Sequence, residues 1–190
     1  MPCLIHYTNL INALKILYSK EIMLGNVSES NDLLEKECID GCDTVFAFCC
    51  SAGPLNAPLW LSYSGRKDGA AIIFSFKSEA LFSKLLKSDK YNIKFCKIQY
   101  SKEYFEEVSN NPSTLFEIKD SRFEYENEYR FYVHFEEIIV SYRIKCKLNL
   151  ECLDKITLVV NQQNAKMVDD IVKKFNLPCE VSVEANDFIQ

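Results

Sequence analysis

Glycine, proline and histidine are scarce in this sequence. Its 190 residues include five glycines, five prolines and two histidines, which excludes collagen-like, linker-rich and low-complexity proteins. No apolar run approaches the roughly 18 residues of a membrane-spanning helix. The first six residues have neither the basic flank nor the apolar stretch of a secretory signal peptide. These absences predict a soluble, cytoplasmic protein without a membrane partner.

Apolar residues, by contrast, are plentiful. Hydrophobic residues make up 48% of the chain and aromatic residues 13%, which is enough apolar surface to offset the entropy of ordering and excludes intrinsic disorder. A chain of this length buries about 70% of the surface that its unfolded form exposes. We therefore expect a single domain over residues 1–190. The formal net charge of −5 argues against a general nucleic-acid-binding protein.

The nine cysteines do not indicate a disulfide framework. Their number is odd, no export signal precedes them, and a domain of this size needs no cross-links. Cys38 and Cys42 are three residues apart and lack the paired Cys-x-x-Cys spacing of structural zinc sites. His6 and His134 have no metal-ligand spacing to each other or to those cysteines. We expect reduced thiols and no metal site.

Hydrophobic periodicity predicts both strands and helices. Thr8 is a candidate cap for a helix whose apolar residues run from Leu10 to Tyr18, and the region 60–63 resembles one helical turn. Further helices are predicted at 77–87 and 163–175. Strands are predicted at 4–7, 22–26, 44–50, 70–76, 93–100, 123–135, 138–144, 156–160 and 179–183. The pattern is typical of an α+β protein with mixed, split antiparallel sheets crossed by a few helices.

Several polar and aromatic residues lie where packing alone does not require them. His6 interrupts an apolar strand, which suits a core histidine with a hydrogen-bond partner as well as a ligand-binding one. Trp60 and Tyr63 share a helical face at a spacing of three, and they are either core residues or a surface for a planar ring. Asn31-Asp32 with Glu35 is either a helix start or a polar site.

Aromatic and charged residues alternate with period two from residue 123 to residue 135. On a strand, this alternation places Glu124, Glu126, Glu128 and Arg130 on one face. Three neighbouring carboxylates repel one another, which disfavours their ionised forms. One interpretation is a solvated edge strand. The other is a set of carboxylates held in place for chemistry.

Five motifs in order resemble a bacterial family, the domain of unknown function numbered 2971, which often occurs near phage-defence genes. The resemblance covers about residues 4–135. Leu33 stands where the family usually has proline, and Cys50 stands where it has phenylalanine. The motifs are His6-Tyr7-Thr8, Asn31-Asp32-x-x-Glu35, Cys49-Cys50-Ser51, Trp60-x-x-Tyr63 and Tyr125-Glu126-Asn127-Glu128-Tyr129-Arg130.

The polar residues of these motifs are similar to the His–Tyr–Glu pattern of the ADP-ribosyltransferase superfamily. That resemblance implies an ADP-ribosyltransferase-like fold that uses NAD as a substrate. His6 would bind a ribose hydroxyl, Tyr63 would stack on the nicotinamide, and Glu128 would bind the 2′-hydroxyl of the nicotinamide ribose. Glu126 or Arg130 would orient the acceptor or a phosphate. Tyr7, Thr8 and Trp60 would complete the NAD-binding residues.

Three functions remain open from the sequence. The first is an NAD-consuming ADP-ribosyltransferase or NAD glycohydrolase, acting in phage defence or as a toxin, with a protein, a nucleic acid or water as the acceptor. The second is a non-catalytic module that binds a nucleotide or a protein. The third is a metal-dependent nuclease using Asp32, Glu35 and the acidic segment, which has no supporting motif. We expect the first, because the Glu-x-Glu-x-Arg face of Glu126, Glu128 and Arg130 is costly to keep for packing alone.

Overall fold

The computed structural model describes residues 1–27, 44–64, 66–110, 114, 116–136 and 144–186. It divides into two compact units that alternate along the chain. Unit 1 contains Met1–Glu21, Cys50–Leu85 and Lys147–Gln190, and unit 2 contains Ile22–Cys49 and Leu86–Cys146. The single domain expected from the sequence over residues 1–190 stays a prediction.

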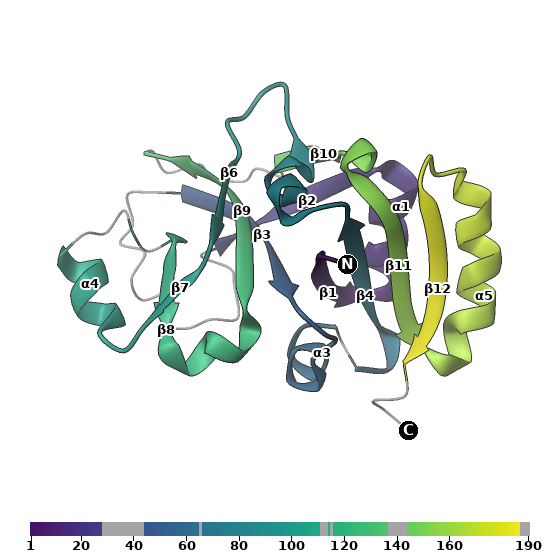
Figure 1. Ribbon diagram of the computed structural model, residues 1–190, viewed down its shortest axis with the longest axis horizontal. Helices are drawn as coiled ribbons and strands as arrows, with labels where there is room; N and C mark the ends of the chain where they lie inside the picture. The colour runs from purple at the N-terminus through teal and green to yellow at the C-terminus, as the bar shows by residue number, and fades with distance from the viewer. Residues whose placement is uncertain (28–43, 65, 111–113, 115, 137–143, 187–190) are drawn as a thin grey trace. The chain divides into compact units, whose positions relative to one another are not determined.

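Unit 1 is built on a sheet of four strands in the order β12-β11-β4-β1, to which the end of β3 adds (Figure 1). All of its pairings are antiparallel except that of β11 with β12, which is parallel. The sheet is therefore mixed, and the predicted α+β class is confirmed. The strands are β1 (Cys3–Asn9), β3 (Thr44–Ala52), β4 (Gly69–Phe76), β11 (Leu153–Asn161) and β12 (Glu180–Asn186).

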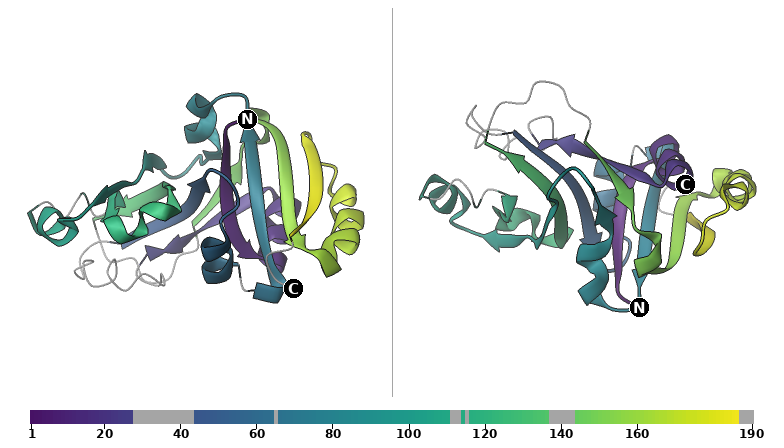
Figure 2. Two further views of the ribbon diagram at one scale, coloured as in Figure 1. Left: turned by 60° about the horizontal axis from the view of Figure 1, so that its bottom comes forward. Right: turned by 90° about the horizontal axis from the view of Figure 1, so that it is seen from above.

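Three α-helices belong to unit 1: α1 (Leu10–Ser19), α3 (Ala57–Tyr63) and α5 (Gln162–Val172). In Figure 1, α1 lies behind the strands and α5 lies beside β12, and Figure 2 shows the same arrangement from two other sides. None of the helices in the described part of the chain has the length and apolar character that crossing a membrane requires. Short 3-10 helices complete the unit: η2 (Arg66–Asp68), η3 (Glu79–Lys84), η6 (Leu150–Cys152) and η7 (Lys173–Phe175).

Two local predictions for unit 1 are wrong. The cap of α1 is Asn9, whose side chain accepts a hydrogen bond from the Asn12 backbone N–H at 2.8 Å, whereas Thr8 still belongs to β1. The helix predicted at 77–87 is only the 3-10 helix η3. It stops there because Asn149 donates to the carbonyls of Lys84 and Leu85, both at 2.8 Å, and so occupies acceptors that a longer helix would need.

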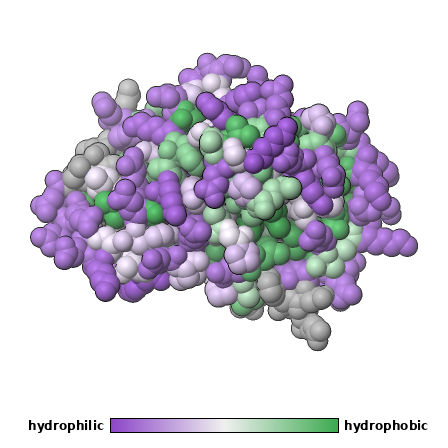
Figure 3. Space-filling model, viewed as in Figure 1, coloured by the Kyte–Doolittle hydropathy of each residue, from purple (hydrophilic) through white to green (hydrophobic). Residues whose placement is uncertain are grey.

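The sheet of unit 1 has a buried apolar cluster on the face against which α3 packs. The cluster contains Trp60 and Leu59 of α3 and strand residues from β1, β4 and β11. Figure 3 shows hydrophobic residues over the region of β4 and β11, with hydrophilic residues around them. On the other face, alternate residues such as Ile72, Phe74 and Leu158 are fully buried, so both sides of β4 and β11 contribute to the core.

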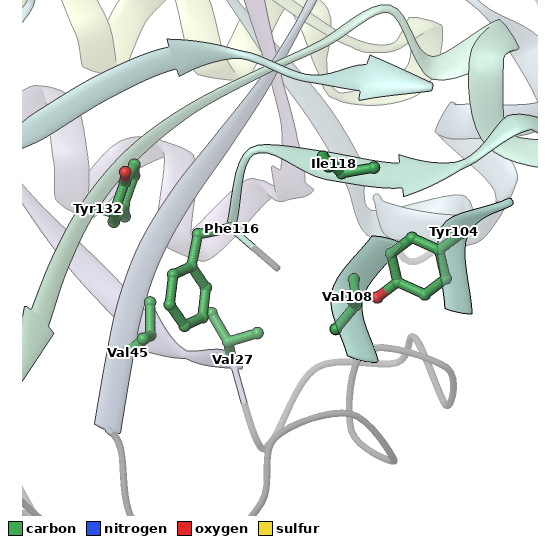
Figure 4. Close-up of a cluster of buried hydrophobic side chains, with 7 residues drawn as sticks. All are labelled: Val27, Val45, Tyr104, Val108, Phe116, Ile118 and Tyr132. Atoms are coloured by element: carbon green, nitrogen blue, oxygen red, sulfur yellow. The ribbon is translucent and has the colours of Figure 1, made fainter. Parts of the chain in front are cut away.

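Unit 2 contains β5 (Leu86–Lys87), β6 (Lys94–Lys97), β9 (Glu128–Phe135) and most of β2 (Glu21–Asn26), β3 and β10 (Ile144–Leu148). β9 lies between β3 and β6. A separate parallel pair, β7 (Gln99–Ser101) and β8 (Ile118–Asp120), is accompanied by α4 (Tyr104–Asn110) and the 3-10 helix η5 (Ser121–Glu126). Figure 4 shows the apolar cluster of unit 2, in which Phe116 and Tyr132 are 5.9 Å apart between ring centroids.

Other predictions are confirmed, are wrong or fall outside the described residues. The helix predicted at 163–175 is confirmed as α5 followed by η7. The single strand predicted at 93–100 is wrong, because this segment forms two strands: β6 pairs with β9, and β7 pairs with β8 in a separate sheet. The Asn31, Asp32 and Glu35 motif, Cys38 with Cys42, and most of the strand predicted at 138–144 lie outside the described residues. The cysteines recorded as free thiols are Cys3, Cys49, Cys50, Cys96, Cys146, Cys152 and Cys179.

We expect Asn9→Ala to lower the free energy of unfolding by about 1 kcal/mol, because it leaves an N-terminal N–H of α1 without its cap. Urea denaturation followed by circular dichroism measures the change. Asn9→Asp is the control and should retain the stability, since aspartate caps helices as well as asparagine does. Equal losses in both variants would show that the cap is unimportant.

Candidate functional site

Four charged side chains are buried together in unit 2, and we call them the charge cluster: Lys119, Glu126, Glu128 and Arg130. Lys119, Glu126 and Glu128 are each 4% exposed, and Arg130 is 3% exposed. Charged side chains are almost never buried to this degree unless they are paired. The charge cluster contains three of the residues that the sequence resemblance assigns to chemistry.

Glu128 is the centre of the charge cluster. Arg130 holds it with two hydrogen bonds, from Nε to Oε1 at 2.7 Å and from Nη2 to Oε2 at 3.2 Å. Lys119 Nζ lies 3.1 Å from Glu128 Oε2 and 2.7 Å from Glu126 Oε2. A single ammonium group therefore joins the two carboxylates, and a guanidinium group binds one of them in bidentate geometry.

A short local structure brings Glu126 and Glu128 to this place. Asp120 caps η5 by accepting from the Arg122 backbone N–H at 2.8 Å. The helix ends at Asn127, which has a left-handed backbone with φ of 42°. Asparagine tolerates this conformation better than most residues, and β9 begins at the next position. The chain therefore changes from helix to strand between the two glutamates.

This break corrects the strand predicted over 123–135. Period two holds from Glu128 onward, but Glu124 and Glu126 are on η5. Glu124 is exposed and is not part of the charge cluster. The interpretation of this segment as a solvated edge strand is also wrong, because Glu126 and Glu128 are buried and β9 has a partner strand on each side.

The charge cluster keeps Glu128 ionised. Burial by itself raises the pKa of this carboxyl, but the positive charges of Arg130 and Lys119 and the hydrogen bonds outweigh burial, and the pKa falls from 4.5 to about 2. The repulsion expected among the carboxylates is thus overcome by two cations. Glu128 is consequently an anion at neutral pH although it is buried.

Two neighbours complete the surroundings of Glu128. Its backbone N–H donates to the Tyr100 hydroxyl at 2.8 Å, and burial raises the pKa of that hydroxyl to about 12. The Cys49 thiol on β3 donates a hydrogen bond to the Glu128 carboxylate. Cys49 is exposed to solvent, in contrast to the charge cluster itself.

Lys119 is the residue of the charge cluster that sequence reasoning missed. It stands between an isoleucine and an aspartate in a short segment without clear periodicity. The charge balance of the sequence contained a signal that could have identified it. Two buried carboxylates need more positive charge than Arg130 supplies, and Lys119 is the lysine nearest to them in the sequence.

The predicted NAD-binding residues of unit 1 fall into different surroundings. Tyr7 and Trp60 lie in one apolar cluster. Tyr7 pairs with Ala71 of β4, whereas His6 pairs with Ile72. Because successive strand residues point to opposite faces, His6 faces the side of the sheet away from the Tyr7–Trp60 cluster, as does Thr8.

Two details distinguish the aromatic residues of this region. The Tyr7 hydroxyl accepts a hydrogen bond from the Asn56 backbone N–H at 2.9 Å, so it supports the start of α3. Trp60 is 2% exposed, whereas Tyr63 on the same helix is 42% exposed. The expected pair therefore consists of one core residue and one ring that solvent reaches.

Within the described residues, no three His, Cys, Asp or Glu side chains are grouped as a metal ion requires. Asp32 and Glu35, which the nuclease hypothesis needs, are outside those residues.

A comparison with protein-family models gives no match, and neither does a comparison with curated proteins. The resemblance to domain of unknown function 2971 therefore rests on its motifs. Among solved structures, the chain is similar to DarT of Thermus sp. 2.9 in complex with NAD+ (TM-score 0.43), with carba-NAD+ (0.43) and with ADP-ribosylated ssDNA (0.45). Each comparison has 13% sequence identity and covers 99% of this chain and 96–97% of the other. At this identity and TM-score, the similarity assigns neither residues nor an activity.

We expect Arg130→Met to lower the free energy of unfolding by about 3–5 kcal/mol, because it leaves a buried charge without its main partner. Arg122→Met is the matched control: its side chain is 67% exposed in the pair with Asp120, and its loss should cost less than about 1 kcal/mol. Urea denaturation at pH 7 measures both.

The difference between wild type and Arg130→Met should depend on pH. The pKa of Glu128 is lowered in the folded protein, so its stabilisation is complete above pH 4.5 and is lost as the pH falls toward 2. The gap between the two proteins should therefore narrow over this range. Similar losses for Arg122→Met and Arg130→Met would show that the charge cluster contributes no more than a surface pair.

Proposed function

We propose that this protein is an NAD-consuming, ADP-ribosyltransferase-like enzyme with Glu128 as its catalytic carboxylate. The observation that carries the proposal is that Glu128 is 4% exposed and yet paired with two cations, Arg130 and Lys119, which keep it ionised. It is also the residue to which the sequence resemblance gives the catalytic role. The likeness to domain of unknown function 2971 and the ADP-ribosyltransferase-like fold are parts of the same proposal.

The reaction needs an anion at this position. When the bond between nicotinamide and C1′ of its ribose breaks, nicotinamide leaves with the electron pair and the ribose becomes an oxocarbenium-like cation. An ionised carboxylate that accepts a hydrogen bond from the 2′-hydroxyl stabilises this charge more than it stabilises the bound substrate. The acceptor then bonds to C1′ and releases a proton; with water as the acceptor, the product is ADP-ribose.

The surroundings of Glu128 suit this role. Fixed donors from Arg130 and Lys119 hold the carboxylate in one orientation, so little reorganisation is needed as charge develops. The exposed neighbour of the carboxylate is Cys49, and we propose that the ribose approaches from the side of this thiol. Its 2′-hydroxyl would replace the thiol as a donor and leave the contacts to Arg130 and Lys119 intact.

Other residues keep the roles that the resemblance gives them. Glu126 would orient the acceptor, and Arg130 would also orient a phosphate. His6 would bind a ribose hydroxyl and Tyr63 would stack on nicotinamide, which agrees with the exposure of its ring. Thr8 would accompany His6 on the same face of β1, and Tyr7 and Trp60 would support the helix that carries Tyr63. These roles are separate parts of the proposal, and each can be tested by substituting its residue.

A second candidate function is a non-catalytic nucleotide-binding module. It is favoured by one observation: both carboxylate oxygens of Glu128 already accept hydrogen bonds from basic side chains. A carboxylate used in this way supports structure even where no reaction occurs. Turnover distinguishes the two functions.

We expect the purified protein to release nicotinamide from NAD, and Glu128→Gln to lower that rate by about 10²–10³-fold with little change in NAD affinity. Chromatography measures nicotinamide, and calorimetry measures binding. Glu124→Gln is the matched control, because Glu124 is exposed and lies outside the charge cluster. Unfolding curves at the assay temperature establish that each variant is folded.

Two further variants test the assigned roles. Tyr63→Ala should weaken NAD binding, because stacking stabilises the bound substrate as well as the transition state. Glu126→Gln should reduce transfer to an acceptor more than hydrolysis. NAD binding without release by the wild type would identify the binding module, and an absence of NAD binding would refute both functions.

A further inference from the structure

We propose that Lys119 is a positioning residue of this reaction, which the β7–β8 pair presents to Glu126 and Glu128 so that the two carboxylates stay side by side. The inference rests on the proposed function. It adds a residue and a structural element to which the sequence resemblance gives no role.

The contacts of Lys119 are those of a bridge between carboxylates. Its Nζ is within hydrogen-bond distance of Oε2 of both glutamates, at 2.7 Å for Glu126 and 3.1 Å for Glu128. The ammonium group also lies 4.8 Å from the centre of the Phe123 ring. With 4% of its surface exposed, this side chain has lost nearly all of its contact with water.

The parallel pair β7–β8 holds Glu128 at three points. Tyr100 of β7 is the register partner of Lys119 of β8. The Tyr100 hydroxyl accepts from the Glu128 backbone N–H, while Lys119 contacts the carboxylate. Just before β7, the Ile98 N–H donates to the Glu128 carbonyl at 2.9 Å. The backbone and the side chain of Glu128 are therefore both held by the β7–β8 pair and by Ile98 just before it.

The charge of Glu128 alone does not explain why Lys119 is buried in addition to Arg130. Arg130 already binds both of its carboxylate oxygens, and burying a further ammonium group carries a large desolvation penalty. What Lys119 adds is the link to Glu126. Without it, two carboxylates would be close together with only Arg130 to balance them, and like charges at short distance raise the pKa of one of the pair.

The charged and titratable groups near Glu128 come from six elements, and each is a possible contributor to its titration. Hydroxyl and thiol groups remain protonated at neutral pH where burial raises their pKa, as it does for Tyr100 and Cys96. In the described part of the chain, the cations that contact Glu128 are Lys119 and Arg130. Among the described residues, these groups are Cys49 of β3, Cys96 of β6, Tyr100 of β7, Lys119 of β8, Glu126 of η5 and Arg130 of β9.

The first test is the pH dependence of nicotinamide release. For the wild type we expect a kcat that does not change between pH 5 and pH 8, because Glu128 stays ionised there. Lys119→Met should lower kcat by about 10–100-fold at neutral pH and move the acid limb of the profile to higher pH. Lys119→Arg should restore the flat profile, and Arg122→Met should match the wild type. A loss in Lys119→Met that is equal at every pH would overturn the proposal.

The second test does not depend on turnover. If Lys119 balances two carboxylates, removing one of them should offset its loss, so the urea midpoint of Lys119→Met should be recovered in large part by adding Glu126→Gln. Adding Glu124→Gln should recover nothing, because that side chain is exposed outside the charge cluster. Failure of Glu126→Gln to compensate would overturn the proposal. If compensation occurs but the wild type releases no nicotinamide, the proposed reaction fails and the pairing of the carboxylates stands.

Discussion

The ion pair between Glu128 and Arg130, extended by Lys119 to Glu126, is the constraint around which unit 2 is arranged. Four charges are almost completely removed from water, and each must be matched by a partner because an isolated charge is prohibitively costly in a protein interior. The left-handed turn at Asn127, which ends η5, and the position of Lys119 on β8 bring these partners together. A shift of any of these would leave one charge without its partner.

Such a cluster is a poor means of gaining stability. Replacing buried ion pairs by apolar side chains of similar volume is often neutral or stabilising, since the cost of desolvation consumes much of the Coulombic gain. Cys96, which packs against the apolar cluster of Val27, Phe116 and Tyr132, also interacts with Arg130 and Glu128. This desolvation cost supports the proposed function, which requires an oriented anion.

The position of Cys49 relates this buried anion to solvent. Glu128 has donors from three strands, and among them only the thiol of Cys49 belongs to an exposed residue. The basic partners Arg130 and Lys119 are buried, whereas the weakest donor belongs to an exposed residue, Cys49. A hydroxyl group displaces a thiol from a carboxylate more readily than it displaces a guanidinium or ammonium group, because hydrogen bonds between charged groups are the stronger ones.

Local patterns in the sequence were sufficient to predict many of the strands and helices. The strands at 70–76 and 156–160 and the helix beginning near 163 are predicted by periodicity, because a buried strand or an amphipathic helix repeats its apolar residues at a spacing that sequence displays directly. Glu126, Glu128 and Arg130 were also identifiable, since acidic residues amid aromatics are unusual.

Tertiary structure decided the features that depend on contacts between distant residues. Asn149, 65 residues from Lys84, limits η3 by taking its carbonyls. Lys119 joins the two glutamates, Glu124 is excluded from them, and Tyr7 and His6 face opposite sides of β1. Each of these depends on which partner a group finds across space, and that choice is determined by the pairing of distant strands and by the cost of leaving a buried charge or carbonyl unpaired.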